Sequence, residues 1–289
     1  MLGRTPNPSR APSWSRRNML ALLAAAAVVA MLLVVGLALA VLASMRPHRP
    51  DSPASGAAAP AARSAANGPS GAATSATGTG IDPATAAARD ALAAAPMPQV
   101  DDAAAQPGPV STRDPGPALL LPAPTGVGPA DVPTGFPRTP LGAMAQLAEI
   151  DRAALQSGRL AEARAVITGW ALPGGPTPAS WSGVAALAAF LQAAGLSGGG
   201  SPQLGLVVSP QMGLIKGTAG ARFVVPCLDF EVDATLAHTA RVAVADCQRM
   251  VWTGQRWMIG PGPEPAEAPS VWPDTDTAVQ VGYRDVHRG

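Results

Sequence analysis

Aromatic side chains are scarce in this chain, and nearly all of them lie in its last part. The 289 residues include four Phe, one Tyr and six Trp, and only Trp14 precedes residue 135. Residues 46–134 hold 16 prolines and no aromatic residue, so this stretch cannot bury enough apolar surface to offset its chain entropy. We therefore expect a disordered Ala/Pro/Gly-rich linker over residues 44–134, with only a marginal helix near 83–95.

Lysine and histidine are also rare, which argues against a phosphate-binding loop and a zinc site. The only lysine, Lys216, does not follow the glycine pattern of a phosphate-binding loop. The three histidines, His48, His238 and His287, have no partners at zinc-ligand spacing, and no Gly-x-Ser-x-Gly motif indicates acyl transfer. The sequence predicts no catalytic residue, no cofactor and no metal site, and we expect the protein not to be an enzyme.

The C-terminal part also lacks an excess of charge of either sign. Residues 135–289 carry 11 basic and 12 acidic side chains, so no basic face for nucleic acid is indicated. These residues form the one stretch with enough aromatic and aliphatic side chains for a stable core. We expect one folded domain over residues 135–262, followed by a C-terminal strap and short helix over 263–289.

The longest apolar run, residues 19–43, has no charge and no proline. As a helix its 25 residues would reach ~37 Å, enough to cross a hydrocarbon core of about 30 Å. This length exceeds the apolar stretch of a secretory signal and predicts a transmembrane helix. Basic residues are clustered more tightly before the run than after it, which favours a cytoplasmic leader over residues 1–18 and an extracytoplasmic C-terminal domain. Arg16-Arg17 also fits part of a twin-arginine export signal, an alternative to the anchor.

Apolar periodicity in the folded part changes from helical to strand-like. Three- and four-residue spacing predicts helices over 140–158, 160–170 and 180–195, with Thr139-Pro140 as the first helix start. Two-residue alternation predicts strands, with a turn at Ser209-Pro210 and a bulge or edge position at Pro226. The predicted strands cover 204–208, 212–218, 228–233, 240–252 and 255–259. Helices followed by a mostly antiparallel curved sheet make an α+β fold.

The two cysteines are candidates for a disulfide. With a hairpin turn near Ala237-His238, Cys227 and Cys247 fall opposite each other on neighbouring strands, within the distance that a disulfide needs. An extracytoplasmic domain would preserve the bond, whereas two reduced, buried cysteines are the alternative.

Three carboxylates lie along one strand, and two large apolar residues lie late in the tail. The alternation turns Asp229, Glu231 and Asp233 away from the apolar face, which favours a solvated acidic face over a general base inside a cavity. We expect them to pair with arginines of neighbouring strands, from the set Arg222, Arg241 and Arg249. Trp272 and Tyr283 either pack back onto the domain or anchor a partner protein.

The order of these elements resembles a known architecture. Three helices on a curved antiparallel sheet are similar to the cystatin-like cone of nuclear-transport-factor-2-like proteins. On one N-terminal span, that cone resembles the bitopic inner-membrane assembly subunit of type IV secretion (conjugation) systems. Residues 134–143, 246–252 and 255–259 also look like parts of actinobacterial membrane-anchored proteins. The resemblance covers about residues 135–262 and carries no catalytic residue across.

Together these features predict a membrane-anchored scaffold or assembly protein. The resemblance implies a conjugative DNA-transfer channel, with other envelope proteins and further copies of the chain as partners. The alternative is an anchored small-molecule binder or cone-fold enzyme, of isomerase or hydrolase type. A cavity filled by Phe223, Phe230 and Trp257 would count against that alternative.

Overall fold

The computed structural model describes residues 83–289, all of which belong to one compact unit, Gly80–Gly289. The predicted leader, the predicted span at 19–43 and the first part of the predicted linker lie outside these residues. Within residues 83–289, no helix combines the length and the apolar character needed to cross a bilayer.

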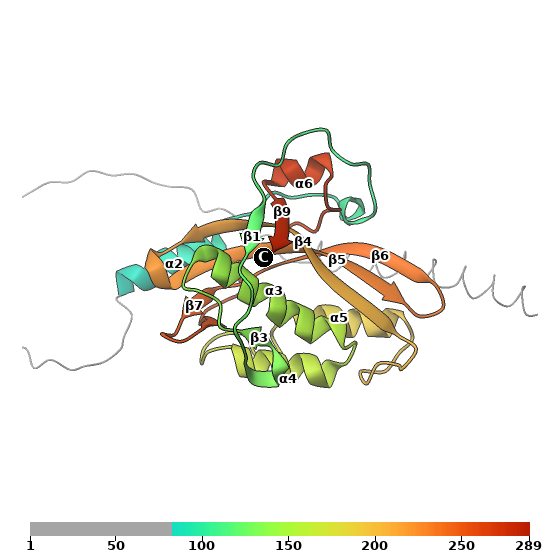
Figure 1. Ribbon diagram of the computed structural model, residues 1–289. Helices are drawn as coiled ribbons and strands as arrows, with labels where there is room; N and C mark the ends of the chain where they lie inside the picture. The colour runs from blue at the N-terminus through green and yellow to red at the C-terminus, as the bar shows by residue number, and fades with distance from the viewer. Residues whose placement is uncertain (1–82) are drawn as a thin grey trace, which may run out of the picture. The chain divides into compact units, whose positions relative to one another are not determined.

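A curved, mostly antiparallel sheet forms the centre of this unit, and its three long strands are visible in Figure 1. They are β4 Gly205–Thr218, β5 Phe223–Thr235 and β6 Thr239–Cys247. The strand order is β1-β9-β4-β5-β7-β8, with β6 also paired to β5. The short strands are β1 Leu119–Leu121, β7 Met250–Trp252, β8 Trp257–Ile259 and β9 Arg284–Arg288, with a separate hairpin of β2 Gly126–Val127 and β3 Pro133–Thr134.

Three helices pack on one face of the sheet, as the periodicity predicts. They are α3 Pro140–Gln156, α4 Leu160–Trp170 and α5 Ser182–Ala193. The Thr139 hydroxyl caps α3 by accepting a hydrogen bond from the Gly142 amide at 3.0 Å. The side chains between these helices and the sheet form a first core, whose largest members include Met144, Leu147, Ile150, Trp170, Trp181, Phe230 and Trp257. The α+β prediction is confirmed at this level.

Two strand predictions differ from the structure. Ser209-Pro210 is not a turn, because β4 continues through it and absorbs the irregularity as a register shift between Pro210 and Met212. A second register shift leaves Lys216 as an extra residue opposite Pro226, which agrees with the predicted bulge. The predicted strand 240–252 is broken at Gln248-Arg249 into β6 and β7, which pair with different parts of β5.

The opposite face of the sheet is covered by segments from both ends of the described chain. These segments contain α2 Pro83–Ala94, η1 Asp102–Ala105 and α6 Asp276–Val281. Of the other short elements, η2 Pro129–Asp131 contacts α4, and η3 Gly220–Arg222 lies between β4 and β5. Thr275 caps α6, and Gly282 ends it with a positive φ of 93°, so the short helix expected within residues 263–289 is present. A second core on this face consists of Ala93, Met212, Phe223, Val225, Cys227, Cys247, Ala268, Val271, Ala278 and Tyr283.

The structure differs from the predicted linker over residues 83–134. This stretch lacks aromatic residues, but its aliphatic side chains pack against aromatic residues from elsewhere in the chain. Leu92, Met97 and Val100 pack on the second core, while Leu119 and Leu121 belong to the first. The predicted domain start at residue 135 therefore lies inside the folded unit.

Candidate functional site

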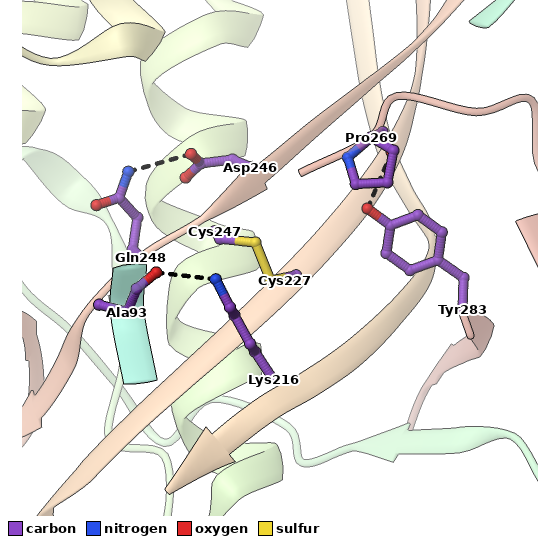
Figure 2. The surroundings of a disulfide bond; sticks show 8 residues. All are labelled: Ala93, Lys216, Cys227, Asp246, Cys247, Gln248, Pro269 and Tyr283. Carbon is purple, nitrogen blue, oxygen red and sulfur yellow. Dashed lines mark hydrogen bonds between the residues drawn. A yellow bond between two sulfur atoms is a disulfide. The ribbon is translucent and has the colours of Figure 1, made fainter. Parts of the chain in front are cut away.

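The disulfide predicted from the hairpin is present. Cys227 and Cys247 are directly paired across β5 and β6, with a Cα–Cα distance of 4.1 Å, and their sulfur atoms are bonded. Figure 2 shows the bond, and both side chains are buried in the second core. The bond therefore joins β5 to β6 directly beneath the segments that cover this face.

Helix α2 is fixed to the disulfide-bearing face through its last turn. The bulged Lys216 donates a hydrogen bond from its ammonium to the Ala93 carbonyl oxygen at 2.8 Å, as Figure 2 shows. The Ala266 amide donates to the same carbonyl at 2.9 Å. A lysine beside the carbonyl end of a helix also complements the negative end of the helix dipole. One helix end thus joins β4 to the C-terminal segment.

Arginine and phenylalanine side chains add a second attachment for α2. Arg249, which is almost fully buried, bonds to the Asp90 carboxylate and lies over the Phe223 ring, with 5.4 Å between its Cζ and the ring centroid. Arg89 lies over the same ring at 5.1 Å. Burial, followed by the charge of Arg249, lowers the pKa of Arg89. Arg249 therefore pairs with an acid of α2 rather than with the acidic row of β5.

The acidic row of β5 is only partly solvated. Glu231 and Asp233 both bond to Arg241, which confirms the expected cross-strand pairing for this arginine. The prediction of a solvated position is wrong for Asp229, which has no exposed surface. Residues 269–271 cross over β5 at this point, and Asp229 Oδ1 accepts a hydrogen bond from the Val271 amide at 3.4 Å.

Burial makes Asp229 an unusual carboxyl group. Burial raises the pKa of Asp229 to about 8, and the hydrogen bond from the Val271 amide acts in the opposite direction. Its Oδ2 has no hydrogen-bond partner among the described residues. A carboxyl group in such surroundings is held in its neutral form at pH 7.

Trp272 and Tyr283 lie on this same face, and neither is a freely exposed aromatic side chain. Tyr283 is fully buried in the second core, and its hydroxyl donates a hydrogen bond to the Pro269 carbonyl oxygen at 3.0 Å (Figure 2). Trp272 is half-buried, and the Arg241 guanidinium lies over its ring at 5.0 Å. Of the two predicted alternatives, packing onto the domain and anchoring a partner, Tyr283 follows the first. It holds the C-terminal segment against the sheet.

A second group of buried acids lies on the other face of the sheet. Burial raises the pKa of Asp151 well above its usual range, and the charges of Asp246 and Glu264 act in the same direction. Burial also raises the pKa of Asp246 to about 7, although hydrogen bonds from Gln248 and Cys247 lower it. Glu264 accepts a hydrogen bond from the Ser182 amide at the start of α5. These three carboxyl groups come from α3, β6 and the loop after β8.

Sequence reasoning did not find Asp151 or Asp246, although one signal was present. Asp151 lies four residues after Leu147 and three before Ala154, so it shares the apolar stripe of α3 that packs on the sheet. The described residues contain no group of three or more His, Cys, Asp or Glu side chains placed to hold a metal ion. Burial therefore favours the neutral form of two of these carboxyl groups, Asp151 and Asp246.

Comparison of the chain with protein-family models, with curated proteins and with solved structures finds no match.

Proposed function

We propose that this chain is a single-span membrane-anchored scaffold protein whose C-terminal domain lies outside the cytoplasm and binds other envelope proteins. The resemblance to the type IV secretion assembly subunit makes a conjugative DNA-transfer channel the first assembly to test. The proposal takes the apolar run at 19–43 as the anchor, and the curved sheet with α3–α5 as a cystatin-like cone.

The observation that carries this proposal is the filled space between the helices and the sheet. Phe230 and Trp257 are 1% exposed and pack with buried side chains of α3, including Met144, Leu147 and Ile150. Phe223, the third side chain expected to fill this space, lies instead in the second core. The indole of Trp257 also donates to the Pro137 carbonyl oxygen at 2.9 Å, which fixes its position. A cone whose interior holds these side chains presents its outer surface, rather than an internal cavity, to other molecules.

The disulfide supports the proposed location. Disulfides persist in oxidising compartments and are rare in the cytosol. Cys227 and Cys247 are the only cysteines of the chain, so the bond leaves no thiol in the oxidised protein. This agrees with a domain on the outer side of the membrane.

Site-specific photo-crosslinking of the full chain in cells tests the scaffold proposal. The photo-reactive residue replaces, one at a time, the large apolar side chains that are most exposed: Val110, Leu120, Val127, Val207 and Leu236. The proposal predicts protein-sized adducts, including adducts to a second copy, that disappear when residues 19–43 are deleted. Absence of adducts at all five positions would contradict it.

Mating frequency tests the assignment to a conjugative channel. A donor with an in-frame deletion should lose transfer by orders of magnitude, and the full chain should restore it while a chain without residues 19–43 should not. Unchanged transfer would reject the channel and leave the adduct partners to identify another assembly.

One observation favours the alternative of a cone-fold enzyme. Asp246 has a pKa raised to about 7, and general acid–base catalysis works best with a group of this kind near neutral pH. The Asp246→Asn chain separates the two proposals. It should complement the deletion if the domain is a scaffold, whereas a folded Asp246→Asn chain that fails to complement would favour the enzyme.

A further inference from the structure

A pocket opens between α3 and the segment that follows β1. Figure 1 shows β1 and β9 side by side near the middle of α3, as their parallel pairing requires. The pocket has a volume of about 170 Å³. Its apolar wall comes from Pro122, Pro124, Phe136, Ala145 and Ala148.

The polar part of the pocket is one buried carboxylate shared by two arginines. Glu149 is 6% exposed, and its Oε2 accepts from the Nε and Nη2 of Arg152 on the same helix. Its Oε1 lies 3.2 Å from Nη1 of Arg288 on β9. All three side chains line the pocket, so the group has a net charge of +1 at the edge of an apolar wall.

Both arginines keep exposed surface beyond their contacts with Glu149. The Arg152 side chain keeps 30% of its surface exposed and the Arg288 side chain 52%. A guanidinium has five N–H donors, and within residues 83–289 no hydrogen bond involves Nη1 of Arg152. The carboxylate of Glu149 thus holds two guanidinium groups in place while their outer donors remain available to an anion.

The size of the pocket limits what the anion can carry. An apolar protein cavity of about 150 Å³ accommodates benzene, so a pocket of about 170 Å³ suits a six-membered ring or a group of similar volume. Pockets for drug-sized ligands are larger, commonly about 300 Å³ or more. The ligand class that fits both the wall and the charge is a monocarboxylate on a ring-sized apolar group.

We propose that this pocket binds a small carboxylate of that class, with Arg152 and Arg288 contacting the carboxylate and Phe136, Pro122 and Pro124 contacting the apolar group. Glu149 is a positioning residue, since both of its oxygens are occupied by the arginines. Such a carboxylate is either a free aromatic acid or the C-terminal residue of a peptide. This site is separate from the scaffold function proposed above and does not depend on it.

Titration of the full chain in detergent with benzoate tests the site, and benzamide is the neutral counterpart of the same shape. Backbone amide shifts of α3 and β9 provide the readout. Saturable binding of benzoate with a millimolar dissociation constant is expected for a ligand of this size, with benzamide at least about tenfold weaker. Equal binding of the two, or no saturable shift with benzoate, would overturn the proposal.

Three variants locate the binding. Arg288→Gln should weaken benzoate by about tenfold or more, whereas Arg164→Gln, an exposed arginine of α4 outside the pocket, should leave it unchanged. Ala123→Phe adds a ring at the exposed rim and should reduce benzoate and benzamide alike without altering the charge. Unchanged binding in both Arg288→Gln and Ala123→Phe would overturn the site.

A further pair of probes separates the two sources of the carboxylate. N-acetylphenylalanine binding more tightly than benzoate would indicate a peptide C-terminus, and the reverse order would indicate a free acid. The Arg288→Gln effect is expected for whichever probe binds.

Discussion

The two faces of the sheet differ in how the chain covers them. The first core is closed by α3, α4 and α5, which follow one another in the sequence and contribute apolar stripes at helical spacing. The second core is closed by residues 83–106, which include α2, and by residues 263–283, which include α6, and most of the domain separates these two segments in the sequence.

This difference explains why the second face needs attachments other than packing. Single hydrogen bonds fix its covering segments. Lys216 and Ala266 donate to the Ala93 carbonyl oxygen, Arg249 donates to the Asp90 carboxylate, and Tyr283 donates to the Pro269 carbonyl oxygen. The Cys227–Cys247 bond joins the strands beneath them. A face covered by sequential helices is stabilised mainly by buried area, whereas a face covered by two segments far apart in the sequence depends also on individual bonds and on the disulfide.

Removal of a large side chain from the first core should give the largest effect. Trp257→Ala leaves a cavity at a 1% exposed position and should lower the free energy of unfolding by about 3–5 kcal/mol. Urea unfolding with the disulfide intact measures it. Trp272→Ala, at a half-buried position on the other face, is the matched control and should cost less. Equal losses would contradict the view that the first core is the main source of stability.

Loss of the disulfide should come next. The bond closes a loop of 20 residues, and the Cys227→Ala/Cys247→Ala chain should be less stable by about 3 kcal/mol. Hydrogen exchange should show the greatest loss of protection in α2 and in residues 263–283, with α3 protected at moderate denaturant. A uniform loss over both faces would show that the two faces unfold as one.

Asp229 should give the second face a pH dependence. In the unfolded chain its carboxyl ionises near pH 4, whereas in the folded protein its pKa is about 8. The folded state therefore holds a proton that the unfolded state has lost, and the contribution of Asp229 to stability falls as the pH rises from about 4 to about 8.

The Asp229→Asn chain should have a flatter stability profile between about pH 5 and about pH 8 in urea unfolding, because the amide cannot ionise. Asp233→Asn, two residues along the same strand face and paired with Arg241, should keep the wild-type slope in this range. A slope unchanged by Asp229→Asn would show that Asp229 is ionised in the folded protein. Asp246 contributes in the same direction and prevents a completely flat profile.

Removal of the exposed Arg241 guanidinium should have the smallest effect. Arg241 bonds to Glu231 and Asp233 at the surface, where such pairs are screened by salt and add little. Arg241→Gln should lower the urea midpoint slightly at low salt and not measurably at high salt. A loss as large as that of the disulfide variant would show that the contact of Arg241 with the Trp272 ring fixes the C-terminal segment.

The two faces also differ in how far the sequence predicts them. Helical spacing predicts α3, α4 and α5, and the cysteine spacing predicts the pairing of β5 with β6. The covering of the second face is not visible in any local pattern, because Leu92 and Met97 lie in a proline-rich stretch and their aromatic partners lie far along the chain. For the same reason Asp229 is predicted to face solvent, since strand alternation gives the face of a side chain but not what lies over it.

The most direct test of this account is the redox state of the two cysteines in the full chain as it exists in cells. The chain has only these two, so alkylation before and after reduction can be read by intact mass. If the Cys227–Cys247 bond is formed and the domain lies outside the cytoplasm, the unfolded chain should take up no alkyl group without reductant and two after reduction. Two alkylations without reductant would show that the thiols are free in the cell, and would contradict both the disulfide and the proposed location.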